Sequence, residues 1–191
     1  MSAPEVITFG AIGTAGLGVL AAAGAMGVGL VFLQAALAKL RHRELLSGVI
    51  ANYRLLPEAL VAPAALLLAP AEIMVGAGLL LSRHWLAALA AIALLIVFAA
   101  AMGINILRGR SQIDCGCGRS QLRQQLSWLL VSRNLVLAAL LVPLLSPGTV
   151  PAPGTAELAI AFAGGLAVFV IVQLFNAIGA LAASPLATPR R

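Results

Sequence analysis

The sequence predicts an all-α fold: a polytopic helical bundle in a membrane, with four to five transmembrane helices. Of its 191 residues, 62% are hydrophobic and only 9% are charged, whereas a soluble protein carries about 25% charged residues. The mean hydropathy is +1.07. Five apolar stretches reach the roughly 20 residues that a helix needs to cross a bilayer. The short alternating segments typical of a transmembrane β-barrel do not occur in the sequence.

The predicted spans lie at about residues 12–37, 60–81, 85–107, 126–145 and 158–181. They form one integral membrane domain over residues 1–183, followed by a short cytoplasmic tail at 184–191. We expect the first span to be retained, because no basic region precedes it and it is longer than the apolar region of a signal peptide. Its small residues would let a neighbouring helix approach closely; they are Gly16, Gly18, Ala21, Ala22, Gly24, Gly27 and Gly29.

The later spans differ mainly in their few polar residues. The second contains Glu72 shortly after Pro70, and the third is apolar except for Asn105 near its end. The fourth carries Arg133 early, and a turn rich in proline and glycine at residues 147–153 separates it from the fifth. We expect four spans to pack against one another, with the remaining span at the C-terminal edge of the bundle.

The placement of basic residues predicts the orientation. Only Arg83 lies on one side of the five-span arrangement, and eleven of the twelve Lys and Arg residues lie on the other. By the positive-inside rule, the N-terminus is then outside and the C-terminus is cytoplasmic. The net charge of +6 is therefore a membrane signal, with lipid and not nucleic acid as the expected partner. The eleven are Lys39, Arg41, Arg43, Arg54, Arg108, Arg110, Arg119, Arg123, Arg133, Arg190 and Arg191.

Glu72 allows two interpretations. An ionisable side chain in hydrocarbon costs several kcal/mol or more, so it should face the bundle or be protonated. It could relay protons or contact a bound cofactor, or it could be a neutral carboxyl that ties two helices by a hydrogen bond. The other polar residues of the spans are expected to hold helices together; they are Asn105, Arg133, Asn134, Gln173 and Asn176.

The two cysteines, Cys115 and Cys117, are separated by one residue within the basic stretch 108–123. Gly116 and Gly118 give the backbone the freedom that so small a disulfide ring requires. Such a ring is expected to be strained and therefore easily reduced, which suits thiol–disulfide exchange better than a structural role. Nearby Arg110, Arg119 and Arg108 would favour a thiolate, whereas Asp114 would oppose it. The pair is the predicted catalytic site.

Two other interpretations of the cysteines remain. Two thiolates could hold Cu(I), a soft metal ion, or the residues could be incidental cytosolic thiols. A closed zinc site needs four ligands, and the chain could supply at most Cys115, Cys117, Asp114 and His42. His84 is predicted on the opposite face of the membrane and cannot join them. We therefore predict no metal site.

Several motifs resemble the methylamine-utilisation protein MauE family, within the wider DoxX-like group. They cover roughly residues 34–142 and are Ala38-Lys39-Leu40, residues 52–57 (Asn-Tyr-Arg-Leu-Leu-Pro), Pro70-Ala71-Glu72, residues 105–118 with the cysteine pair, and Arg133-Asn134. In the family pattern Phe-Gly follows the second cysteine, whereas here Gly118 follows directly and the Phe is absent.

The resemblance implies a bacterial inner-membrane protein that supports maturation of a periplasmic disulfide-containing client, in the family the small subunit of methylamine dehydrogenase. It implies a thioredoxin-like periplasmic partner, and a quinone is a possible cofactor. Partner and client are outside, whereas the charge pattern places the cysteines inside. Either the protein carries reducing equivalents across the bilayer, or it is a quinone-linked oxidase with its thiols outside. A small-solute transporter and a non-catalytic assembly factor are the alternatives from other functional classes.

Overall fold

The computed structural model describes residues 9–82, 84–113, 125–146 and 154–182, and these ranges contain six α-helices and one short 3₁₀ helix. Five of the α-helices contain stretches long and apolar enough to cross a bilayer, so the predicted polytopic helical bundle is confirmed. In chain order the elements are α1 (Phe9–Arg41), α2 (Arg43–Tyr53), α3 (Glu58–Leu81), α4 (Trp85–Leu107), α5 (Trp128–Leu141), η1 (Val142–Leu145) and α6 (Thr155–Ala182).

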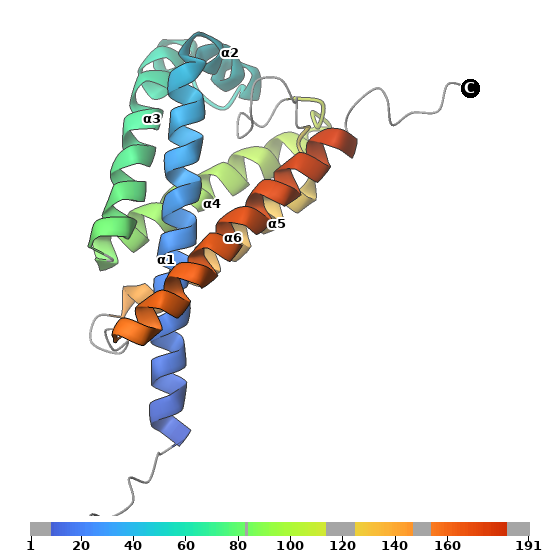
Figure 1. Ribbon diagram of the computed structural model, residues 1–191. Coiled ribbons are helices and arrows are strands. Elements are labelled where there is room, and N and C mark those ends of the chain that lie inside the picture. The colour runs from blue at the N-terminus through green and yellow to red at the C-terminus, as the bar shows by residue number, and fades with distance from the viewer. Residues whose placement is uncertain (1–8, 83, 114–124, 147–153, 183–191) are drawn as a thin grey trace, which may run out of the picture.

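Helix α1 is the central element of the bundle. It packs along α3 on one side and along α6 on another, while α4 pairs with α5 (Figure 1). Smaller contacts of α1 with α5 and of α3 with α4 join these units. The short helix α2 lies at one end of α1, beside the start of α3, and is not a span (Figure 1).

Glycines allow α1 to approach its two main neighbours closely. A Cβ atom added at Gly76 in α3 would lie 2.9 Å from the carbonyl oxygen of Gly29 in α1. One added at Gly27 would lie 2.7 Å from the Cβ of Val168 in α6. Real Cβ atoms do not approach other atoms so closely, so both helix pairs depend on the missing side chain. Small residues at membrane helix interfaces serve this purpose generally, as the composition of the first span predicts.

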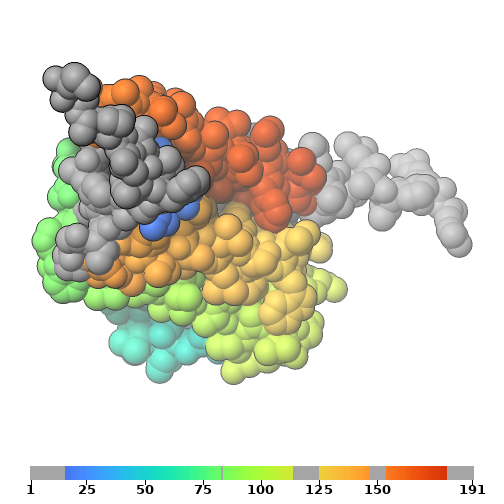
Figure 2. Space-filling model, turned by 90° about the horizontal axis from the view of Figure 1, so that it is seen from below, coloured from blue at the N-terminus to red at the C-terminus, as the bar shows by residue number. Residues whose placement is uncertain are grey.

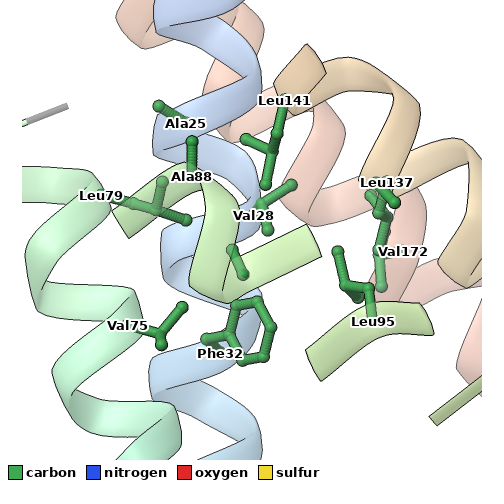
Figure 3. Packing of buried hydrophobic residues seen from close by; sticks show 12 residues of the cluster. Ala25, Val28, Phe32, Val75, Leu79, Ala88, Leu95, Leu137, Leu141 and Val172 are labelled. Atoms are coloured by element: carbon green, nitrogen blue, oxygen red, sulfur yellow. The ribbon is translucent and has the colours of Figure 1, made fainter. Parts of the chain in front are cut away.

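The main apolar core lies where all five spans meet. Val28 and Phe32 of α1 project toward Leu79 of α3, Leu95 of α4 and Leu141 of α5 (Figure 3). Each of these side chains is buried. Close contact among these buried side chains holds the helices together, because lipid tails are as apolar as the core and only tight packing favours protein over lipid.

Helix α6 lies against α1 and exposes most of its remaining surface. In the view from below, the orange-to-red surface of α6 lies beside the yellow-orange surface of α5 (Figure 2). Two side-chain hydrogen bonds fasten it to the bundle. Gln173 donates to Gln34 of α1, and Asn176 accepts from Arg133 of α5. These contacts confirm that three of the intramembrane polar residues, Arg133, Gln173 and Asn176, join helices.

Helix α2 is absent from the sequence expectation, which places no element between the first two spans. It follows α1 almost directly and buries Leu46. It ends at Tyr53, after which Arg54 takes a left-handed conformation with φ of 49°. Residues rarely adopt this region except at turns and helix ends. Pro57 then precedes α3, where the lack of an N–H group costs no helical hydrogen bond.

Candidate functional site

The predicted catalytic residues Cys115 and Cys117 lie outside the described residues, as do Asp114, Gly116, Gly118 and Arg119. The described chain runs to Ile113 and begins again at Gln125. We call residues 114–124 the cysteine segment. The structure describes the residues on both sides of this segment: the end of α4 with residues 108–113, and residues 125–127 with the start of α5. We call these residues the frame of the cysteine segment.

The two ends of the frame meet. The backbone N–H of Leu126 donates to the carbonyl oxygen of Ser111 over 3.0 Å. The chain turns away from α4 at Gly109, whose φ of +71° favours glycine because it has no Cβ. The chain therefore enters and leaves the cysteine segment at one place, near the C-terminal end of α4.

Arg110 ties this place to two helices. Its Nη1 atom donates to Oδ1 of Asn105 over 3.3 Å, and its Nη2 atom donates to the carbonyl oxygen of Asn52 over 2.8 Å. Asn105 belongs to α4 and Asn52 to α2. The backbone N–H of Arg110 also donates to the carbonyl oxygen of Asn105 over 2.9 Å. The predicted supporting residues Arg110 and Asn105 are thus in direct contact.

Asn105 is expected to help hold helices together, and the structure shows that its side chain reaches another helix only through Arg110. Its side chain is fully buried, and Nδ2 donates to the carbonyl oxygen of Ala101 in its own helix over 3.0 Å. Its Oδ1 accepts from Arg110, which follows the same helix. Asparagine can bond to the preceding helical turn and still offer an acceptor. The connection to α2 is therefore made by Arg110 and not by Asn105.

A second apolar cluster supports the frame. Leu126 is buried against Met102 of α4 and Leu130 of α5. Tyr53 from the end of α2 and Ile113 from the edge of the cysteine segment pack against the same cluster. The residues on both sides of the segment are thus part of the folded bundle, together with the end of α2.

Glu72 forms a buried ion pair elsewhere in the bundle. The Nζ atom of Lys39 lies 2.8 Å from Oε1 and 2.9 Å from Oε2 of Glu72, and the two side chains are 9% and 1% exposed. The same Nζ lies 5.7 Å from the centre of the Phe98 ring, within the range of a cation–π contact. The prediction that Glu72 faces the bundle is confirmed.

The sequence interpretation missed Lys39 and Asn52. From the sequence, the first span ends at residue 37 and Lys39 lies beyond it on the cytoplasmic side, but α1 continues to Arg41 and turns this side chain toward α3. Its apolar neighbours in sequence, together with a single carboxylate in the spans, are the signal that could have revealed the pair. Asn52 contributes a backbone oxygen, which any residue has, so no sequence signal marks it.

Arg133 belongs to a third polar group. Its Nε and Nη2 atoms donate to Oδ1 of Asn134 over 3.4 and 3.1 Å, besides the bond to Asn176. The structure thus distributes the predicted supporting residues over three places: Arg110 with Asn105, Glu72 with Lys39, and Arg133 with Asn134. Among the described residues, no three His, Cys, Asp or Glu side chains are grouped so that they could hold a metal ion.

Known proteins resemble this chain over most of its length. Residues 17–147 match the family model described as methylamine utilisation protein MauE. A protein named methylamine utilization protein MauE from Paracoccus denitrificans is 46% identical over 158 residues, which cover 81% of this chain and 84% of the relative. The protein of that name from Methylorubrum extorquens is 47% identical over 146 residues, covering 74% and 78%.

A third relative of that name, from Paracoccus versutus, is 43% identical over 160 residues, covering 80% of this chain and 83% of the relative. No solved structure matches the chain. The matched region contains every described contact of the frame, from Asn52 to Leu126.

Proposed function

Because this chain belongs to the methylamine utilisation protein MauE family, we propose that it is a membrane thiol–disulfide redox protein that supports methylamine utilisation through Cys115 and Cys117. In this proposal it sits in the bacterial inner membrane and serves the maturation of a periplasmic client that contains disulfides. The client suggested by the family is the small subunit of methylamine dehydrogenase, and the suggested redox partner is a thioredoxin-like periplasmic protein.

One observation carries the proposal. The chain's two cysteines lie in a segment that begins and ends beside the bond between Ser111 and Leu126. The residues on both sides of the segment pack against α2, α4 and α5. A reactive pair needs a fixed base so that a partner protein meets it in one orientation. Incidental thiols would have no need of such a frame.

The chemistry is a balanced exchange. A thiolate of the pair attacks a sulfur of the partner's disulfide, which forms a mixed disulfide and releases one partner thiolate. The second cysteine then attacks the mixed disulfide, so the pair becomes a disulfide and the partner leaves as a dithiol. Two electrons pass to the partner and two protons follow them. The reverse sequence reduces the pair at the expense of the partner's dithiol.

Single Cys115→Ser and Cys117→Ser variants test the proposal, because removing the second thiol should trap the mixed disulfide. We expect at least one of them to accumulate a covalent adduct with a thioredoxin-like protein in cells, visible on a non-reducing gel and lost after treatment with dithiothreitol. The double variant is the matched control and should form none.

Absence of an adduct from both single variants, with a wild-type pair that stays reduced across the physiological range of potentials, would overturn the proposal. Full activity in the double variant would instead favour a small-solute transporter or a non-catalytic assembly factor. Copper bound by the wild type and not by the double variant would favour the soft-metal interpretation.

A further inference from the structure

We call the place where Arg110 and Ser111 meet Leu126 the base of the cysteine segment. We propose that Arg110 is a positioning residue: it holds this base against the C-terminal end of α2, and it acts through this geometry and not through its charge. The contacts of Arg110 carry the assignment, and its consequence for exchange chemistry rests on the proposed function. The sequence alone suggests a different role, in which Arg110 stabilises a cysteine thiolate.

The first argument is the shape of the guanidinium group. Its two terminal nitrogens bind acceptors on different helices, the side chain of Asn105 on α4 and the backbone of Asn52 on α2. A guanidinium is a planar fork with fixed donor directions, so two such bonds fix its orientation. A point charge that only stabilised a neighbouring thiolate would need neither bond.

The second argument is the end of α2. The last carbonyl groups of a helix lack partners in the helix and carry a partial negative charge, which a cation can satisfy. No basic residue lies in the last turn of α2. Arg110 supplies the cation from 58 residues away in the sequence, by donating to the Asn52 carbonyl over 2.8 Å. It therefore caps α2 from outside.

The third argument is that the backbone is fixed at Arg110 itself and at the next residue, Ser111. The N–H of Arg110 is bonded to the Asn105 carbonyl, and the carbonyl of Ser111 is bonded to Leu126. Asn105 is itself held by its bond to Ala101 and is fully buried. The guanidinium links this base to α2 by its bond to the Asn52 carbonyl. Its loss should free the base to shift relative to α2.

Arg108 provides a matched control. It lies two residues earlier, carries the same charge and is exposed. If charge near the cysteines were the relevant property, replacing either arginine by glutamine would have a similar effect. If geometry is the relevant property, only position 110 matters. Arg110→Lys separates the two further, because lysine keeps the charge but cannot reproduce the planar fork.

The geometric test needs no redox activity. Spin labels are placed at Gly48→Cys on α2 and at Gln112→Cys beside the base, in the full chain with Cys115→Ser and Cys117→Ser. Both positions are exposed, and a Cβ at Gly48 would meet nothing within 4 Å. We expect one narrow distance distribution in this parent and in Arg108→Gln. Arg110→Lys and Arg110→Gln should broaden or displace it, and Asn105→Ala, which keeps the arginine, should broaden it as well.

A distribution in Arg110→Lys identical to that of the parent would overturn the proposal. If the Arg110 variants cannot be purified folded, the Asn105→Ala distribution decides instead, and an unchanged distribution there would overturn it too. Thermal unfolding of each variant accompanies the measurement, because a general loss of stability lowers the melting temperature without altering the distance in molecules that remain folded.

The functional test uses the wild-type cysteines. We expect Arg110→Lys to slow mixed-disulfide formation per folded molecule by up to about 100-fold, because a misplacement of reacting groups by about 1 Å can cost a factor of that size. The pH midpoint of cysteine alkylation by a maleimide should stay that of the wild type. A raised midpoint in Arg110→Gln, with normal behaviour in Arg110→Lys, would show that charge is the cause and would contradict the proposal. If the wild type forms no mixed disulfide, the proposed function fails, and the distance measurement still decides the role of Arg110.

Discussion

Lys39 and Glu72 form an ion pair in which Nζ of the lysine contacts both carboxylate oxygens, at 2.8 and 2.9 Å. The lysine comes from the last turn of α1 and the glutamate from the interior of α3. Charges far from water are costly, and mutual attraction with good geometry offsets that cost. The pair therefore explains how a carboxylate is accommodated in an apolar span.

Breaking the pair on one side should destabilise the protein strongly. Lys39→Met removes the cation that faces a buried carboxylate, and Glu72→Gln removes the anion that faces a buried ammonium group. Loss of one partner of a buried pair costs about 3–5 kcal/mol. The double variant Lys39→Met/Glu72→Met removes both charges and should recover most of this loss. Thermal unfolding in detergent measures the effect, and a double variant no more stable than the singles would contradict the pairing.

The same variants separate the two interpretations of Glu72. Glu72→Gln keeps the shape of the side chain, and Lys39→Met/Glu72→Met removes both charges, but position 72 cannot titrate in either variant. If the residue handles protons or contacts a cofactor, the double variant should regain stability without regaining activity in cells. If the pair only joins α1 and α3, activity should return together with stability. Protein level in the membrane is measured alongside, so that lost activity is not confused with lost expression.

The glycine contacts of α1 should tolerate no side chain. Gly76→Ala would bring a Cβ to 2.9 Å from the Gly29 carbonyl oxygen, and Gly27→Ala would bring one to 2.7 Å from Val168. Each substitution forces helices apart, and overpacking of this kind costs about 1–3 kcal/mol. Gly16→Ala is the matched control, because nothing lies within 4 Å of its added Cβ. It should leave the melting temperature unchanged or raised; a loss equal to that of Gly76→Ala would refute the close approach.

The polar contact between α1 and α6 should contribute less. Gln173→Leu removes the donor to Gln34, and hydrogen bonds between membrane helices are worth about 0.6–2 kcal/mol. We expect a small fall in melting temperature, with a normal fold. Gln34→Leu should have a similar effect, and the double variant should not add the two losses, since both remove one bond. Fully additive losses would show that the two glutamines act separately.

The sequence predicted the spans but few of the polar partnerships. Apolar length alone identifies a helix such as α4, because the bilayer sets that length. Lys39 was misplaced because helix α1 extends past the apolar run. Its apolar neighbours indicate that its side chain turns inward, but the local sequence does not identify Glu72 as its partner. The bond from Arg110 to Asn52 joins residues 58 positions apart through a backbone atom. Such contacts depend on how the helices pack in three dimensions, and the pattern of residues along the sequence does not predict which distant residues will meet.

The orientation of the protein is the last prediction, and it bears on how the cysteines meet a periplasmic partner. Eleven basic residues on one side favour an outside N-terminus and a cytoplasmic C-terminus. Alkaline phosphatase, active only outside, should be active when fused after Arg83 or after Pro147. Fused after Arg54 or at the C-terminus, it should be inactive. Inactivity after either Arg83 or Pro147 would contradict this topology.

A membrane-impermeant maleimide applied to intact cells then locates the cysteine pair itself. The charge pattern predicts that Cys115 and Cys117 are protected in intact cells and labelled once the membrane is opened, because their segment lies among basic residues expected to stay in the cytoplasm. Gln112→Cys in the variant lacking both cysteines is the control for access to the same face. Labelling of Cys115 or Cys117 in intact cells, with the control protected, would mean that the pair reaches the periplasmic side through the bundle. Labelling of both the pair and the control would instead reverse the orientation and place the frame beside its proposed partner.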